Sequence, residues 1–146
     1  MNGPPPTRLV FISELRTVPH HSKVRFIGCV THYDVKSGRL GVEHKRRSPS
    51  STKPTTNDDD NTTTTTTTTV LVDIYHVLNA IKADDLEVGA WLNVFGYVRP
   101  EAHASLQGQV YVEATMIINA GAIRIGEYEQ TVCDVQEIDR SVARPF

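Results

Sequence analysis

The chain of 146 residues has the length of a single domain, and its 15 Lys and Arg residues nearly balance 17 Asp and Glu residues. This balance argues against a protein that binds nucleic acid on its own through a strongly basic surface. Two cysteines, Cys29 and Cys133, fit neither a disulfide framework nor a zinc site. No secretory signal is expected, and no run of about 18 apolar residues predicts a membrane span.

The charge is distributed unevenly along the chain. Residues 1–53 contain ten Lys and Arg against three Asp and Glu, whereas residues 54–146 contain five against fourteen. The first part could therefore form a basic face, and an ordinary mixed surface is the alternative.

Two segments are expected to lie outside the folded core. Residues 1–8 form a Pro-rich tail, and residues 46–69 contain Thr, Ser, Pro, Asn, Asp and basic residues without a large apolar side chain. Such segments cannot bury enough surface to offset the entropy of ordering them. We therefore predict one domain over residues 9–144 with a disordered Thr-rich insert at 46–69.

Five segments have the composition of β-strands, being rich in β-branched and aromatic residues and bounded by turn residues. In the fifth strand, alternation predicts one face formed by Val110, Val112, Ala114, Met116 and Ile118. The expected strands are residues 23–33, 39–44, 70–74, 91–99 and 109–118.

A short helical pattern at residues 75–81 separates the third strand from the fourth. Five strands with a helix in this position have the order of an OB-fold, a small and partly open β-barrel. The predicted fold class is therefore all-β with helices: a five-stranded OB-fold barrel with a long C-terminal α-helix.

The C-terminal helix is predicted over residues 127–143, which contain neither Gly nor Pro. Its apolar residues recur every three or four positions and form one stripe. Because the barrel closes its own core, we predict that this stripe contacts a partner protein; the alternative is that it only covers the barrel. The predicted interface residues are Tyr128, Val132, Val135, Ile138 and Val142.

Several blocks of the sequence resemble a known family: Phe11–Leu15 (FISEL), Lys23–Val30 (KVRFIGCV) and Tyr33–Asp34, followed by weaker blocks at Val70–Ile74 and Val94–Val98. The chain resembles the smallest subunit of the telomere-capping CST complex in its fungal form, which is itself similar to the smallest subunit of replication protein A. The resemblance covers roughly residues 9–45 and 70–143, and the Thr-rich insert departs from it.

This resemblance implies an OB-fold whose C-terminal helix dimerises with the middle OB-fold subunit of the complex. It further implies a nuclear protein of the chromosome telomere that helps to protect single-stranded telomeric ends. The small subunit of replication protein A, or another genome-maintenance OB-fold protein, is the alternative.

Single-stranded DNA is expected to bind mainly to the partner subunits, with an auxiliary contact on this chain. OB-folds combine cationic side chains for phosphates with aromatic rings on which bases stack. Arg39, near the second strand, could add a phosphate contact. Strand parity selects the other candidates for such contacts: Arg25, Tyr33, Tyr97, Arg99 and Tyr111.

No group of residues predicts catalysis. The six histidines are scattered without metal-ligand spacing, and the carboxylate runs at residues 58–60 and 84–85 lie in polar sequence. We expect no enzyme activity, cofactor, metal or small-molecule substrate. A stand-alone nucleic-acid binder and an enzyme-accessory barrel remain as rival classes, although a stand-alone barrel has no use for the terminal helix.

Overall fold

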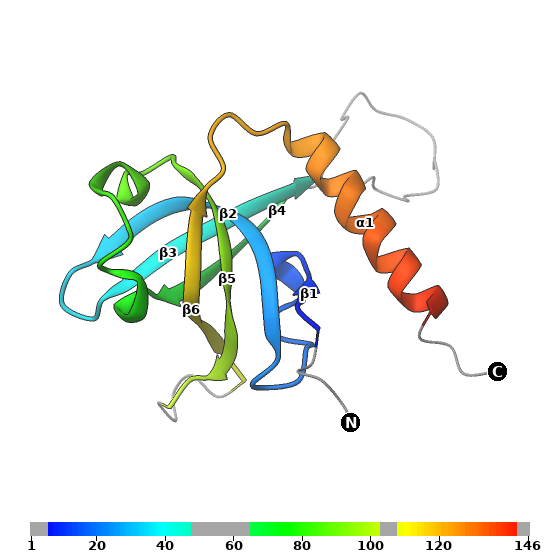
Figure 1. Ribbon diagram of the computed structural model, residues 1–146, viewed down its shortest axis with the longest axis horizontal. Coiled ribbons are helices and arrows are strands. Elements are labelled where there is room, and N and C mark those ends of the chain that lie inside the picture. Colours follow the sequence, from blue (N-terminus) through cyan, green and yellow to red (C-terminus); the bar gives the residue numbers. More distant parts are fainter. Residues whose placement is uncertain (1–5, 48–64, 103–107, 143–146) are drawn as a thin grey trace, which may run out of the picture.

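The computed structural model describes residues 6–47, 65–102 and 108–142. In this part of the chain, strands form a barrel and one long helix lies beside it (Figure 1). Within the same residues, no helix combines the length and the apolar character that a membrane span requires. The elements in chain order are β1 (Arg8–Leu9), η1 (Ile12–Glu14), β2 (Lys23–Asp34), β3 (Arg39–Arg47), β4 (Thr65–Asp73), η2 (Tyr75–Val77), η3 (Ala83–Leu86), β5 (Trp91–Pro100), β6 (Val110–Asn119) and α1 (Ile125–Val142).

The strands close into a barrel because β2 is long enough to pair on both sides. The strands of the barrel are hydrogen-bonded in the order β2-β3-β4-β6-β5, and β5 also pairs with β2, which closes the barrel. The pair β4–β6 is parallel, the other pairs around the barrel are antiparallel, and β1 adds a two-residue parallel strand beside β2. The predicted OB-fold is confirmed, with β1 as an additional strand.

Alternating apolar residues fill the barrel interior. Along β5, Leu92, Val94, Gly96 and Val98 are buried, while Asn93, Phe95 and Tyr97 between them are only partly buried. Gly28 in β2 leaves room for close packing, since a Cβ atom there would lie 2.9 Å from the Cβ of Val42. Burial of such side chains is the main favourable contribution to folding.

The alternation predicted for the fifth strand is wrong beyond Ala114. The β5–β6 register shifts between Phe95 and Gly96, whose partners are Met116 and Ala114, so one extra residue of β6 forms a bulge. A bulge reverses which face the following residues occupy. Ile117 therefore packs on the core, whereas Met116 and Ile118 are 45% and 49% exposed.

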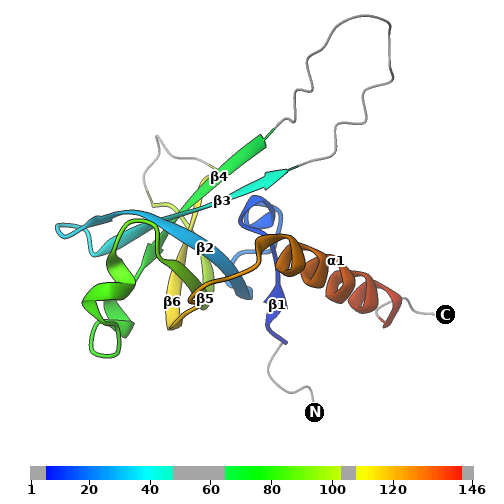
Figure 2. The same ribbon diagram turned by 90° about the horizontal axis from the view of Figure 1, so that it is seen from above.

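The predicted insert, residues 46–69, is too long at both ends. Strand β3 continues to Arg47 and β4 begins at Thr65, and these two residues are register partners. Threonine is β-branched and favours strands despite its polarity. Figure 2 shows the β3–β4 pair extending away from the rest of the barrel. The remainder of the insert, residues 48–64, lies outside the described residues, as does most of the predicted tail.

The other helical predictions differ from the structure in detail. The helical pattern at residues 75–81 forms only the 3-10 turn η2, followed later by η3. The C-terminal helix is confirmed but begins two residues earlier than predicted, at Ile125.

Candidate partner interface and nucleic-acid surface

Helix α1 fills a gap at the edge of β2. On that edge β1 pairs with β2 as far as Arg25, and β3 pairs from Cys29 onward. The backbone N–H of Ile27 therefore has no strand partner there, and it donates a hydrogen bond to the Tyr128 hydroxyl at 3.2 Å. Burial raises the pKa of Tyr128 to about 12, so this hydroxyl is neutral when it accepts the bond.

The contact between α1 and the rest of the protein continues for two further turns. Val132 is fully buried. One turn later, the side-chain amide of Gln136 donates to the carbonyl of Leu9 at 3.2 Å and to the carboxylate of Glu14 at 2.8 Å. Tyr128, Val132 and Gln136 are spaced four apart and so lie on one face of the helix.

A buried histidine forms a second link between α1 and the barrel. The Nε2 atom of His44 lies 3.0 Å from a carboxylate oxygen of Glu129. Rings of Phe11, Trp91 and Tyr128 surround this imidazole at centroid distances of 5.9, 6.0 and 6.2 Å. Such packing fixes the orientation of α1 at its N-terminal end.

The predicted interface stripe is therefore divided between two roles. Val132 is wrong as an interface residue because it is buried within the chain, and the Tyr128 hydroxyl is occupied by β2. In contrast, Ile138 is 61% exposed and Val142 is 81% exposed, while Val135 is partly buried. The stripe predicted from spacing is real, but the barrel covers only its N-terminal part.

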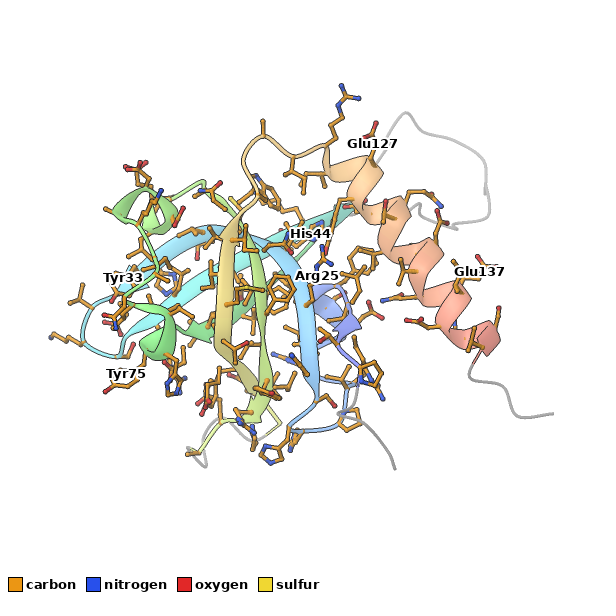
Figure 3. The ribbon with its side chains drawn as sticks, in the orientation of Figure 1. Arg25, Tyr33, His44, Tyr75, Glu127 and Glu137 are labelled. Atoms are coloured by element: carbon orange, nitrogen blue, oxygen red, sulfur yellow. The ribbon has the colours of Figure 1, made fainter. Side chains whose placement is uncertain are left out.

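A second exposed apolar surface lies on the sheet. On the outer face of the sheet, register places Phe95 of β5 between Arg25 of β2 and Met116 of β6. Two residues further along the strands, Asn93 of β5 pairs with Ile118 of β6 on the same face. Figure 3 shows Arg25 on the side of β2 that faces α1. The guanidinium lies over the Phe95 ring at 5.3 Å and 3.4 Å from the Asn93 side chain. No carboxylate pairs with it among the described residues.

We call the exposed apolar residues at the end of α1 the helix flank: Val135, Ile138 and Val142. We call those on the sheet the sheet strip: Phe95, Met116 and Ile118. The two are separate surfaces, because the last turns of α1 extend away from β5 and β6 (Figures 1 and 2).

The six predicted nucleic-acid residues do not form one surface. Arg25 lies over Phe95 of the sheet strip, and Tyr33 is partly buried against the core. The other four gather across β3, β6 and β5, where Arg99 and Tyr111 are register partners. We call this set the Arg–Tyr cluster: Arg39, Tyr97, Arg99 and Tyr111.

Each arginine of the Arg–Tyr cluster covers a tyrosine ring and pairs with a carboxylate. Arg39 lies over Tyr111 at 4.2 Å and contacts Glu101 at 2.5 Å. Arg99 lies over Tyr97 at 5.2 Å and 3.6 Å from Glu113, which also lies 3.7 Å from His76.

Glu101 and Glu113 were missed by sequence reasoning. Glu113 could have been found, because it has the same strand parity as Tyr111. Glu101 follows β5 in a connection whose path no local pattern predicts. The two carboxylates neutralise the charges that were expected to attract phosphate.

A mixed cleft of about 930 Å³ lies between the start of α1 and the barrel. Burial raises the pKa of the Cys29 thiol in its wall, which makes this thiol less reactive at neutral pH. The described residues contain no group of three or more His, Cys, Asp or Glu side chains placed to hold a metal ion. The lining residues are Cys29, Glu43, Lys45, Thr67, Trp91, Ile125, Gly126 and Glu129.

A closed OB barrel with an amphipathic helix and an exposed apolar surface is typical of a subunit in a larger assembly. The model of the Ten1 family, described as a telomere-capping CST complex subunit, matches residues 1–133, and the chain belongs to this family. Members of this family cap telomeres as subunits of the CST complex, so the role of the family lies at chromosome ends. None of the curated proteins matches the chain.

Two solved structures are similar to the chain and support its fold. A chain in the crystal structure of the S. pombe Stn1–Ten1 complex is 24% identical with a TM-score of 0.60, covering 92% of this chain and 96% of that one. The S. pombe telomere-capping protein Ten1 is also 24% identical with a TM-score of 0.60, covering 90% of this chain and 99% of that one.

Proposed function

We propose that this chain is a non-catalytic nuclear subunit that binds the middle subunit of the telomere-capping complex through the helix flank. Through that partner it helps to hold and protect single-stranded telomeric DNA. The observation that carries this proposal is the exposed apolar flank on the last turns of α1. Family membership supports the telomeric role.

A helix of the partner is the occupant that this surface fits. A helix packed along the helix flank would cover Ile138 and Val142, which are exposed in the free chain. Amphipathic helices bind apolar surfaces through apolar residues spaced three or four apart. The S. pombe structure, whose description names a Stn1–Ten1 complex, is consistent with a partner of this kind.

Arg25 adds a charge requirement to the partner helix. Its guanidinium lies beside Tyr128 and has no carboxylate partner among the described residues. Covering this cation would be costly unless the partner supplied an opposite charge. We therefore expect an Asp or Glu on the partner helix opposite Arg25, and we assign Arg25 to partner binding instead of DNA binding.

The test is a double substitution, Ile138→Glu with Val142→Glu, in the full chain. Both side chains are exposed in the free chain, so its circular dichroism and melting temperature should stay unchanged. Two carboxylates in an apolar contact should weaken partner binding on the order of 100-fold or more. Binding is measured by co-purification and titration calorimetry with the middle subunit.

Val35→Glu with Val88→Glu is the matched control, since both valines are exposed and lie outside the helix flank. This control should bind like the wild type. A folded Ile138/Val142 double variant that keeps wild-type affinity would place the interface elsewhere.

A further inference from the structure

Arg39 and Tyr111 form the closest cation–aromatic pair of the described residues, with the guanidinium carbon 4.2 Å from the ring centre. The arginine covers the tyrosine, so a base cannot stack on Tyr111 while Arg39 holds this position. Arginine guanidinium planes can themselves serve as stacking surfaces for unpaired bases. The roles expected from the sequence, stacking for tyrosine and phosphate binding for arginine, are therefore reversed at this site.

The surroundings of Arg39 also disfavour a phosphate. Glu101 pairs with it at 2.5 Å and is itself only 6% exposed, so this ion pair is not easily opened. Register places Asp34 directly opposite Arg39 on β2 and Asp73 directly opposite it on β4. Residues directly opposite on neighbouring strands have Cβ atoms about 5 Å apart. A phosphate approaching Arg39 would therefore meet three carboxylates.

The position in the fold suits an oligonucleotide contact. Arg39 begins β3 directly after the β2–β3 turn, and Glu101 begins the connection from β5 to β6. These two connections are the ones that OB-folds use to bind oligonucleotides. An uncharged ligand surface, such as the face of a nucleobase, avoids the repulsion that a phosphate would meet.

We propose that Arg39 is a stacking platform for one nucleobase of single-stranded nucleic acid, supported from below by Tyr111 and held in place by Glu101. This inference rests on the proposed telomeric function and refines how the chain contacts DNA. It concerns a surface separate from the helix flank.

The test compares Arg39→Lys with the wild type in the full chain. Lysine keeps the charge and can still pair with Glu101, but it removes the planar group. Stacking one base is worth on the order of tenfold or more in affinity. We expect Arg39→Lys to weaken binding of a labelled 12-nucleotide single-stranded DNA about tenfold, measured by fluorescence anisotropy, with the slope of log affinity against log salt unchanged.

Two further variants keep the result interpretable. Tyr111→Leu leaves the Arg39–Glu101 pair in place and removes the supporting ring, so it should also weaken binding. Arg16→Lys, at an exposed position in the turn after η1, should bind like the wild type.

Two outcomes would overturn the stacking platform. The first is an Arg39→Lys variant with wild-type affinity, as expected if Arg39 contacted a phosphate through its charge alone. The second is a wild-type chain without measurable affinity at low salt. Co-purification with the middle subunit should be unaffected by Arg39→Lys, and oligonucleotide affinity should be unaffected by the Ile138/Val142 double variant. Failure of either proposal is thereby distinguished from failure of the other.

Discussion

At the scale of single residues, the Tyr128 hydroxyl replaces a missing strand. It satisfies the Ile27 N–H in the gap between β1 and β3 on one edge of β2. A buried N–H left without an acceptor costs about 1–3 kcal/mol. This single bond therefore couples the position of α1 to the closure of the barrel.

Tyr128→Phe should lower the free energy of unfolding by about 1 kcal/mol, because the ring still packs but the acceptor is lost. Tyr75→Phe is the control, since Tyr75 is exposed and its hydroxyl has no comparable role. Denaturant unfolding monitored by circular dichroism measures both variants. Equal stability of Tyr128→Phe and the wild type would contradict the role given to this bond.

The same hydroxyl predicts a pH dependence at high pH. Burial raises the pKa of Tyr128 from 10.0 to about 12. Above pH 10 the unfolded chain ionises this tyrosine while the folded chain keeps its proton, so the stabilisation is complete below pH 10 and is lost as pH rises through about 12. The stability difference between the wild type and Tyr128→Phe should therefore shrink between pH 10 and 12.

Residue-level prediction from sequence failed where distant residues decide the environment. Strand parity predicted that Tyr97, Arg99 and Tyr111 face away from the most apolar faces, yet no local pattern could show that Glu101 approaches Arg39 from 62 positions away. It also could not show the bulge in β6, because a bulge depends on the register with the partner strand.

At the scale of elements, α1 is a helix with two environments. Its N-terminal part is held by Tyr128, Glu129, Val132 and Gln136, and its last turns are exposed. The 3.6-residue periodicity predicted the helix well, since it is a local property. Periodicity does not show how far the barrel extends along the helix, so it could not divide the stripe.

Gln136→Ala should loosen the docked part of α1. This change removes the hydrogen bonds to Leu9 and Glu14, worth about 1 kcal/mol, and should speed amide exchange near the residue about fivefold. Gln130→Ala is a matched control, because Gln130 is exposed and bonds only to Asp134 one turn away. Hydrogen exchange with mass spectrometry measures the amide exchange rates of both variants. Equal exchange in the two variants would show that the Gln136 contacts do not hold the helix.

At the scale of the whole molecule, the fold brings the basic and acidic parts of the sequence together. Strands β2 and β3 come from the basic first part, and β4 to β6 and α1 come from the acidic remainder. The pairs Arg39–Glu101 and His44–Glu129 join the two parts. The basic face that the composition allowed is therefore partly neutralised, which suits an auxiliary role in DNA binding.

The overall topology was predictable because strand composition, turn residues and the spacing of elements all indicated one barrel. The extent of the helix flank was not predictable, because it depends on where the barrel stops covering α1. Sequence patterns identified the stripe on the helix, but they assigned Arg25 to DNA and placed Met116 and Ile118 on one strand face with Ala114.

Photo-crosslinking tests the helix flank, the central claim, most directly. Benzoylphenylalanine replaces Ile138 or Val142 on the helix flank, or Val35 in the β2–β3 turn; all three positions are exposed in the free chain. With the purified middle subunit, the probes at 138 and 142 should both form crosslinks to the same partner helix, identified by mass spectrometry, and the probe at 35 should form none. Crosslinks from position 35 without any from 138 and 142 would contradict the account.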